Sequence, residues 1–337
     1  MAATPDGPLP AAAIGHVGMA EVAYQRNQLE VATEQVTEGI RQGRQLGYRQ
    51  PLATGLATLA WIRQATGDPA GALAAMGEAE AAGPSAGVTD LLNPVPVLAA
   101  RLRLAAGDSA AAAAWAREHR LASGDRPDYP HERAYLLLAR VLVAGDAAGQ
   151  ALELLEHLHA LAVAQRRTGS AIEVRAVQAL ALAAAGDETA ALAALTDAVA
   201  LAAPEGHLRV FADEGPPMAA LVGRLVTARR REPAAPGGAA AGYLGRLVRA
   251  FEPQGRAGER PGRPGTVAVP GLVEPLSARE LEVLGYLAAG ASNQQIADEL
   301  VVALATVKKH VSHVLGKLGA ANRTQAVTRA RELGLLR

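Results

Sequence analysis

A short turn signature recurs at about 40-residue spacing along the first two thirds of the chain, and this repeat limits the fold more than any other feature. The five copies are Asn27-Gln28, Gly67-Asp68, Gly107-Asp108, Gly145-Asp146 and Gly186-Asp187, at steps of 40, 40, 38 and 41 residues. Glycine and asparagine tolerate the left-handed conformation that ends helices, and aspartate can cap the next helix. Each unit is therefore predicted to be a helical hairpin, and residues 1–231 a stack of hairpins, an α-solenoid.

The composition favours helices throughout the chain. Half of the 337 residues are hydrophobic, but only 3% are aromatic, and alanine and leucine supply the excess. This bias predicts an all-α protein. No uncharged apolar run is long enough to span a membrane, so no membrane contact is expected. The chain has no cysteine and no N-terminal signal peptide, which predicts a cytoplasmic location without disulfides or thiolate metal sites.

Small and large apolar residues are expected to have different roles in packing the predicted hairpins. Small residues near the start of a second helix, as at Ala70 and Gly71, allow close helix packing. Leucines are expected to fill the space between neighbours, namely Leu73, Leu152, Leu155, Leu192 and Leu195. Trp61 and Trp115 are expected to pack between repeats, with an inner-groove position left open for either.

The composition changes after residue 231. Two stretches rich in proline and glycine flank an amphipathic segment from Tyr243 to Phe251. We interpret residues 232–274 as a flexible linker that contains one short helix. Its arginines could touch phosphate, but the pattern favours a soluble tether.

Residues 275–337 open with the signals of a short helix. Ser277 and Glu280 form a capping box, in which each side chain accepts a free backbone N–H of the helix start. The helix is expected over about 278–289, and Gly290 ends it.

Three further helices are expected after this one. Ser292 caps a second helix over 293–300. A third is expected over about 304–318. The fourth begins after Asn322, whose side chain can cap it, and runs to about Gly334.

The third helix has one apolar face and one cationic face. At about 100° per residue, one narrow arc holds the expected buried residues, Val307, Val311, Val314 and Leu318. The opposite side holds Ala305, Lys309, Ser312 and Gly316, flanked by Lys308 and His313. The only three lysines of the chain, Lys308, Lys309 and Lys317, all lie on this helix. A slim cationic face that donates hydrogen bonds suits the major groove of double-stranded DNA.

Charge is distributed unevenly along the chain. From residue 275 onward there are eight lysines and arginines against five acidic residues, a net charge of +3. The remainder keeps 25 of the 33 basic and 28 of the 33 acidic residues, a net charge of −3. This asymmetry supports nucleic-acid contact at the C-terminal end and nowhere else.

The C-terminal motifs resemble a known family. Leu276-Ser277-x-Arg279-Glu280, Ser292-Asn293-x-x-Ile296-Ala297, Thr306-Val307-Lys308-x-His310 and Lys317-Leu318 are similar to the four-helix DNA-binding domain of LuxR-type regulators. The resemblance implies that the third helix is the recognition helix. It places Lys308, Lys309 and Ser312 toward bases, with His313 beside them, and Thr306 and Lys317 near phosphates. Ala303 and Leu304 depart from the family's usual polar residues at the start of this helix.

The long N-terminal part resembles tetratricopeptide repeats, with a somewhat longer period. A solenoid followed by a LuxR-type domain is similar to the C-terminal portion of the large MalT-like, ATP-dependent LuxR regulators, and Leu208–Gly215 resembles the end of their solenoid. Those regulators carry a nucleotide-binding domain ahead of the solenoid. A P-loop needs a lysine, and none occurs before Lys308, so no cofactor is expected.

No catalytic constellation is recognisable in the sequence. His157 and His159 lack the spacing of a zinc-protease helix, and no nucleophile elbow or dinucleotide motif occurs. The sequence therefore predicts no enzyme. The resemblance implies instead a transcriptional regulator that binds double-stranded DNA as a homodimer.

The resemblance implies that this homodimer pairs along the fourth helix, with candidates for packing inside the domain or against the partner at Ala326, Val327, Ala330 and Leu333. An unknown effector or protein partner is expected on the solenoid, and RNA polymerase is a further candidate partner. The alternative is a solenoid scaffold whose helix-turn-helix contacts protein.

Overall fold

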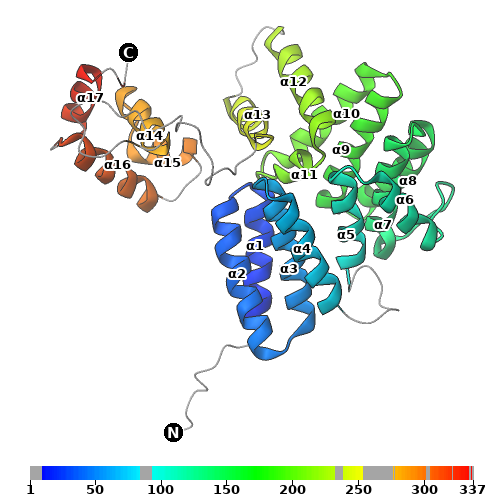
Figure 1. The fold of residues 1–337 in the computed structure, drawn as a ribbon. Coiled ribbons are helices and arrows are strands. Elements are labelled where there is room, and N and C mark those ends of the chain that lie inside the picture. The colour runs from blue at the N-terminus through cyan, green and yellow to red at the C-terminus, as the bar shows by residue number, and fades with distance from the viewer. Residues whose placement is uncertain are drawn as a thin grey trace. The chain divides into compact units, whose positions relative to one another are not determined.

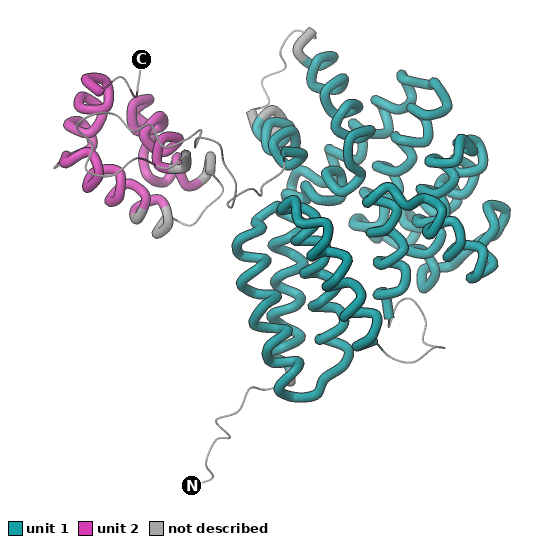
Figure 2. The backbone as a smooth tube through the Cα atoms, in the orientation of Figure 1, with its two compact units in different colours: residues 1–256 teal, residues 257–337 magenta. Residues whose placement is uncertain are grey.

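The computed structural model describes residues 10–83, 93–231, 238–252, 276, 278–300, 304–320, 322–333 and 335. The chain divides into two compact units, residues 1–256 and 257–337 (Figure 2). Helices build both units, and the described residues contain no β-strand. The all-α expectation is confirmed.

The described part of the first unit begins with five helical hairpins. They pair α1 (Pro10–Gln25) with α2 (Leu29–Leu46), α3 (Arg49–Ala65) with α4 (Pro69–Ala82), α5 (Val95–Ala105) with α6 (Ser109–Glu118), α7 (Glu132–Ala144) with α8 (Ala148–Ala164), and α9 (Thr168–Ala184) with α10 (Glu188–Ala202). A single 3-10 turn, η1 (Tyr129–His131), precedes α7. Successive hairpins stack on one another (Figure 1). The predicted solenoid is confirmed.

Each hairpin turns through one residue in the left-handed conformation. These residues are Asn27, Gly67, Gly107, Asp146 and Gly186, with φ between 58° and 92°. In every case the next backbone N–H donates to the carbonyl five residues earlier, as in a Schellman turn. The steps between these residues are 40, 40, 39 and 40. The structural repeat is thus more regular than the sequence signature indicates.

The fourth turn corrects the sequence expectation by one residue. Asp146, expected as a helix cap after Gly145, itself adopts the left-handed conformation, which aspartate tolerates better than most residues. Ala147 therefore occupies the cap position and makes no side-chain bond. The caps predicted in the other turns are confirmed: one backbone N–H donates at 2.9 Å to each carboxylate of Asp68, Asp108 and Asp187.

Alanine and leucine fill the seams between helices mostly as expected. Leu155 and Leu195 are fully buried, and Leu152 and Leu192 are partly buried. The expectation for Leu73 is wrong, because this side chain is 46% exposed. The buried stripe of α4 is made instead by Ala72, Ala75, Met76 and Ala79, and Leu73 lies outside it.

Three further helices cover the last hairpin. They are α11 (Arg209–Ala212), α12 (Pro216–Arg231) and α13 (Gly238–Ala250). Phe211, Met218, Leu221 and Leu247 from these helices join one apolar cluster with Leu195 of α10. The end of the hairpin stack is therefore capped by the chain itself.

Helix α13 corrects the interpretation of the linker. The sequence places an isolated helix at Tyr243–Phe251, but Tyr243, Leu244 and Leu247 are buried among α9–α12. The Tyr243 hydroxyl also donates to the His207 carbonyl. The first compact unit thus continues beyond residue 231. The rest of the expected linker, 232–237 and 253–274, lies outside the described residues.

The capped end of the solenoid contacts its first hairpin. The Leu208 N–H donates to the Gln25 carbonyl at 2.7 Å, and the Tyr24 hydroxyl donates to the Asp213 carboxylate at 2.9 Å. Figure 1 shows α11 beside one end of α1. Within the first unit the hairpins therefore curve far enough to bring the two ends together.

The second unit consists, in its described part, of α14 (Ala278–Ala288), α15 (Asn293–Leu300), α16 (Leu304–Leu318) and α17 (Arg323–Glu332). Its core contains Val283, Leu284, Ile296, Val314 and Ala326, all fully buried or nearly so. One apolar cluster thus joins residues of all four helices.

Candidate functional site

Two local caps set the directions of the helices around the candidate DNA surface. The Ser292 N–H donates to Gln295 Oε1 at 2.8 Å, and the Gln295 N–H donates to Ser292 Oγ at 3.2 Å, which forms a reciprocal capping box at α15. Gly290 ends α14 in the left-handed conformation. The predicted caps at Ser292 and Asn322 are confirmed, the latter accepting the Gln325 N–H at 2.9 Å. Ser277 lies outside the described residues.

The buried face of α16 is the one expected. Val307, Val314 and Leu318 are buried in the core, and Val311 is partly buried against it. The burial of this face holds α16 against α14 and α15. It leaves the opposite side of the helix outside the core.

The described outer residues of α16 combine charge with hydrogen-bonding capacity. Lys308, Ser312 and His313 are exposed, and so is Gly316. Gly316 adds no side chain to this face. The side chains of Thr306 and Lys309, also expected here, lie outside the described residues. The structure thus brings three expected site residues to one accessible helix face.

Lys317 has a structural contact that the sequence did not indicate. Its ammonium donates to Glu280 Oε2 at 2.8 Å, and Glu280 is only 4% exposed. His313 Nδ1 lies 3.9 Å from the other carboxylate oxygen of Glu280. These contacts link α16 to the start of α14. The phosphate-binding role of Lys317 stays a prediction, and the lysine has this second task.

Helix α17 uses its apolar residues inside the domain. Ala326 and Ala330 are fully buried, and Val327 and Leu333 pack against the same core. The sequence left open whether these residues pack inside the domain or against a partner, and in the structure they pack inside the domain. The outer side of α17 is polar, with Thr324, Thr328, Arg329 and Arg331 exposed.

The first unit contains a second candidate site, a cavity of about 810 Å³. Helices α3, α5, α7 and α9 each contribute the same three positions of the hairpin repeat to its wall. The first position holds Trp61, Arg101, Arg140 and Leu180, the second Gln64, Leu104, Val143 and Ala183, and the third Ala65, Ala105, Ala144 and Ala184. Residues of α11–α13 complete the wall. The cavity is thus the inner face of the solenoid, enclosed by the returning C-terminal helices.

A network of paired charges borders this cavity. Glu214 accepts hydrogen bonds from Arg140 at 2.6 Å and from Arg101 at 3.2 Å. Arg140 also donates to Glu173 at 2.8 Å. Burial alone would raise the pKa of Glu173, but attraction to Arg140 and Arg101 lowers that pKa to about 2. The network ties α5, α7 and α9 to the segment after α11.

The two tryptophans differ in their surroundings. Trp61 lines the cavity, the Arg101 guanidinium lies over its ring at 5.0 Å, and its indole N–H has no acceptor among the described residues. Trp115 instead stacks on His119 with ring centroids 3.9 Å apart. The inner-groove position left open by the sequence is therefore found for Trp61.

Sequence reasoning missed the arginines of the cavity. Arg101 and Arg140 follow Trp61 by 40 and then 39 residues, so one repeat position carries all three. Aligning the repeats on their left-handed turn residues would have found this pattern. Glu214 gave no signal, because its position depends on the return of the chain across the solenoid.

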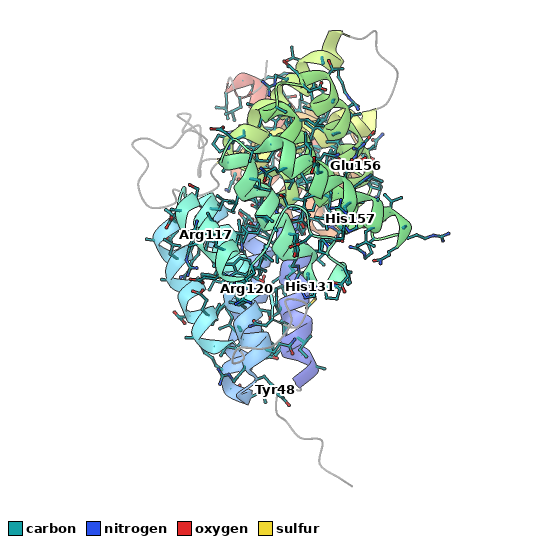
Figure 3. The ribbon with its side chains drawn as sticks, turned by 90° about the vertical axis from the view of Figure 1, so that its right-hand side faces the viewer. Tyr48, Arg117, Arg120, His131, Glu156 and His157 are labelled. Atoms are coloured by element: carbon teal, nitrogen blue, oxygen red, sulfur yellow. The ribbon has the colours of Figure 1, made fainter. Side chains whose placement is uncertain are left out.

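The histidines of the solenoid have ordinary partners. His131 Nδ1 contacts Asp128 at 2.6 Å, and His157 Nε2 contacts the Pro127 carbonyl at 3.2 Å. Figure 3 shows the two histidines on different segments. Across the described residues no three histidine or acidic side chains are grouped to hold a metal ion. Nor does any described helix have the length and apolar character of a membrane span.

Fold and site together define a helical-repeat protein with a C-terminal helix-turn-helix domain. The family model of the MalT-like TPR region matches residues 1–228, and the model of the bacterial regulatory proteins of the luxR family matches residues 274–330. The chain therefore belongs to the MalT-like TPR family and carries a LuxR-type domain.

One curated relative is the HTH-type transcriptional regulator MalT of Serratia proteamaculans (strain 568). It is 48% identical over 67 residues, which are 19% of this chain and 7% of the relative. The chain thus spans only a small part of that protein's length. The family match and this relative support a DNA-binding transcriptional regulator.

Proposed function

We propose that the chain regulates transcription by inserting α16 into the major groove of double-stranded DNA. The observation that carries this proposal is the two-sided character of α16. Its apolar side is fixed in the core, and Lys308, Ser312 and His313 are exposed on the other side. A helix held in this way can present hydrogen-bond donors to base edges.

The proposed division of roles follows the chemistry of the side chains. Lys308 and Lys309 meet guanine acceptors, and Ser312 and His313 bond to neighbouring base edges. Thr306 contacts a phosphate at the helix start. Lys317 contacts phosphate from the helix end while its ammonium stays near Glu280. Its contribution to DNA affinity is therefore smaller than that of Thr306.

We further propose that two copies bind the operator. A helix-turn-helix domain reads only a few base pairs, and a dimer that spans two half-sites about one helical turn apart gains affinity and specificity. The DNA-binding module in this proposal is residues 275–337. Because the outer side of α17 is polar, a pairing along α17 alone would be weak.

The solenoid is proposed as the receptor of a small-molecule effector or a protein partner. The cavity of about 810 Å³ supports a small-molecule effector, because ligand sites are commonly about 300–1,000 Å³. RNA polymerase remains a candidate partner for an activator.

The DNA proposal is tested by selecting duplexes from a random library with the full chain, followed by footprinting. The expected result is an enriched motif with two half-sites. A Lys308→Ala, Ser312→Ala variant that retains its helicity should lose the enrichment. Enrichment that survives in this variant, or a library that stays random with the unaltered chain, would contradict the role of α16.

The effector proposal can be tested by tryptophan fluorescence. The chain contains two tryptophans, so Trp115→Phe leaves Trp61 in the cavity as the sole indole fluorophore. Titration with metabolite pools is expected to change its emission, and Trp61→Phe, which retains Trp115, should not respond. An unchanged emission with every pool would favour the protein-partner form.

A scaffold protein is the alternative function, in which the helix-turn-helix contacts protein. The charge asymmetry of the chain favours DNA, since the net charge of +3 is confined to residues from 275 onward. A scaffold would bind duplexes with neither sequence preference nor steep salt dependence.

A further inference from the structure

One wall of the solenoid cavity has polar side chains beside an aromatic ring. Trp61, Gln64 and Arg101 all line the cavity. Gln64 follows Trp61 by three residues on α3, so the two residues share a helix face. The Arg101 guanidinium lies over the Trp61 ring, 5.0 Å from its centroid. These three residues, which we call the Trp61 group, therefore lie together on one side of the cavity.

The fold uses Arg101 less fully than its neighbour Arg140. Arg140 donates to Glu214 at 2.6 Å and to Glu173 at 2.8 Å, and its side chain is only 7% exposed. Arg101 makes one hydrogen bond within the described residues, from Nη2 to Glu214 at 3.2 Å, and its Nη1 is 3.5 Å from Glu173. The Arg101 side chain is 19% exposed. Since a guanidinium has five N–H donors, Arg101 retains donors for a further acceptor.

Gln64 adds a second polar side chain at the same place. It is partly buried, and its side-chain amide makes no hydrogen bond within the described residues. An amide of this kind can donate and accept at once. Gln64 and Arg101 can therefore donate together to one acceptor atom of a ligand that lies against Trp61.

The rest of the cavity wall is mainly apolar. Leu104, Val143 and Leu180 line it, together with alanines from α3, α5, α7 and α9. A ligand with many hydroxyl groups would leave several of them without partners against this wall, which is costly. The wall therefore suits a ligand with an apolar body and few polar atoms.

The charges beside the Trp61 group are balanced. Arg101 and Arg140 face the two carboxylates of Glu173 and Glu214. An anionic ligand would compete with these carboxylates for the same arginines, in a site where an uncompensated charge is costly. An uncharged acceptor can bond to Arg101 without disturbing the ion pairs.

We infer that the cavity binds an uncharged, mainly apolar molecule that carries a carbonyl group. The carbonyl oxygen accepts hydrogen bonds from Arg101 and Gln64, and the body of the molecule packs against Trp61 and the apolar wall. This inference rests on the proposed effector role of the cavity and names the chemical class of the effector.

Three small probes test the inference by NMR on the full chain. Labelling with 15N-tryptophan gives one indole signal from Trp61 and one from Trp115, since the chain has two tryptophans. Acetophenone, ethylbenzene and benzoate share a benzene ring and differ in carrying a carbonyl, a hydrocarbon or a carboxylate group. Acetophenone should shift the Trp61 signal and leave the Trp115 signal in place. Its dissociation constant should be about tenfold or more below those of the other two probes.

Variants of the polar side chains give a second readout. Gln64→Leu should weaken acetophenone binding about threefold or more, and so should Arg101→Lys, which keeps a cation beside Glu214 but loses the guanidinium donors. Gln50→Leu, at an exposed position of the same helix, is the matched control and should bind acetophenone normally. Circular dichroism checks that each variant stays folded. Unchanged acetophenone binding in both cavity variants would overturn the inference.

The other outcomes separate this inference from the proposals on which it rests. Equal binding of acetophenone and ethylbenzene would overturn it, because the apolar wall alone would then account for binding. Tighter binding of benzoate would overturn it in favour of an anionic ligand. Both results leave the effector role of the cavity in place. If no probe shifts the Trp61 signal, the inference and the small-molecule effector fail together, while the DNA proposal is judged separately by duplex selection.

Discussion

The two units of this chain are both built from helices around apolar cores, but they place their charges in opposite ways. In the solenoid, Arg140 and Glu214 are paired with both side chains only 7% exposed. In the helix-turn-helix domain, Lys308 and Ser312 are exposed on the outer side of α16. Buried pairs fix how elements meet, whereas exposed cations on a rigid helix are available to a ligand. Charged side chains therefore hold elements of the fold together in one unit, and in the proposed function they contact DNA in the other.

The comparison is tested most strongly at Arg140. Arg140→Leu leaves Glu214 and Glu173 near the cavity without their main partner, and an uncompensated buried charge costs about 3–5 kcal/mol. Urea unfolding of the full chain should show this loss in the transition of the solenoid. Arg117→Leu, on the surface of α6, is the control and should change stability by less than about 0.5 kcal/mol. A small effect at Arg140 would mean that the network does not hold the solenoid's returning end.

Lys317 sharpens the comparison because it combines both uses of charge. Lys317→Met removes the ammonium that contacts the buried Glu280 carboxylate, and we expect the helix-turn-helix domain to lose about 2–3 kcal/mol. Thermal unfolding monitored by circular dichroism measures the loss. The double variant Lys317→Met, Glu280→Gln should recover part of it. A variant of normal stability with a salt slope lower by about one unit would instead assign Lys317 to phosphate alone, with no part in holding the domain together.

Lys308 tests the exposed side of the comparison. Lys308→Ala should weaken binding to the selected duplex by about 1–3 kcal/mol and relax the preference at one base position. Domain stability should stay unchanged, because the side chain contributes nothing to the core. Binding to a scrambled duplex should fall much less. Equal losses on both duplexes would show that Lys308 only positions the helix.

Glu173 should make the stability of the solenoid fall in acid. The pKa of this carboxyl is lowered from 4.5 to about 2 in the folded chain, so its pairing stabilises the fold above pH 4.5. That stability falls away as the pH drops from 4.5 toward 2, with about 1–2 kcal/mol at stake after allowance for partial exposure. Unfolding curves at several pH values, with Glu173→Gln as the control, measure this contribution. An equal acid dependence in the variant would contradict it.

Local signals predicted the helices and turns well. Ser292, Asn322 and Asp68 act as caps because a cap depends only on residues within one turn. The 40-residue period predicted the solenoid for the same reason, since each hairpin repeats one local design. Asp146 shows the limit: whether it caps or turns depends on one residue of register, which the signature Gly145-Asp146 does not settle.

Contacts between distant segments could not be predicted in this way. Glu214 meets Arg140 across 74 residues, and α13 enters the solenoid core after a stretch that reads as a linker. The Glu280–Lys317 contact likewise joins two helices that are separate in sequence. The outer face of α16 was predictable because its helix period is a local property. The cavity was not, because it exists only once the hairpins have curved and the chain has returned.

A salt titration tests the central claim most directly. The affinity of the full chain is measured for the selected duplex and for a scrambled duplex of equal length, across a range of salt concentrations. The account predicts tighter binding to the selected duplex at every salt concentration, with affinity falling at a log–log slope of about −3 or steeper, because several cations displace counterions from phosphate. Equal affinity for both duplexes, or an affinity independent of salt, would contradict a DNA-reading role for α16.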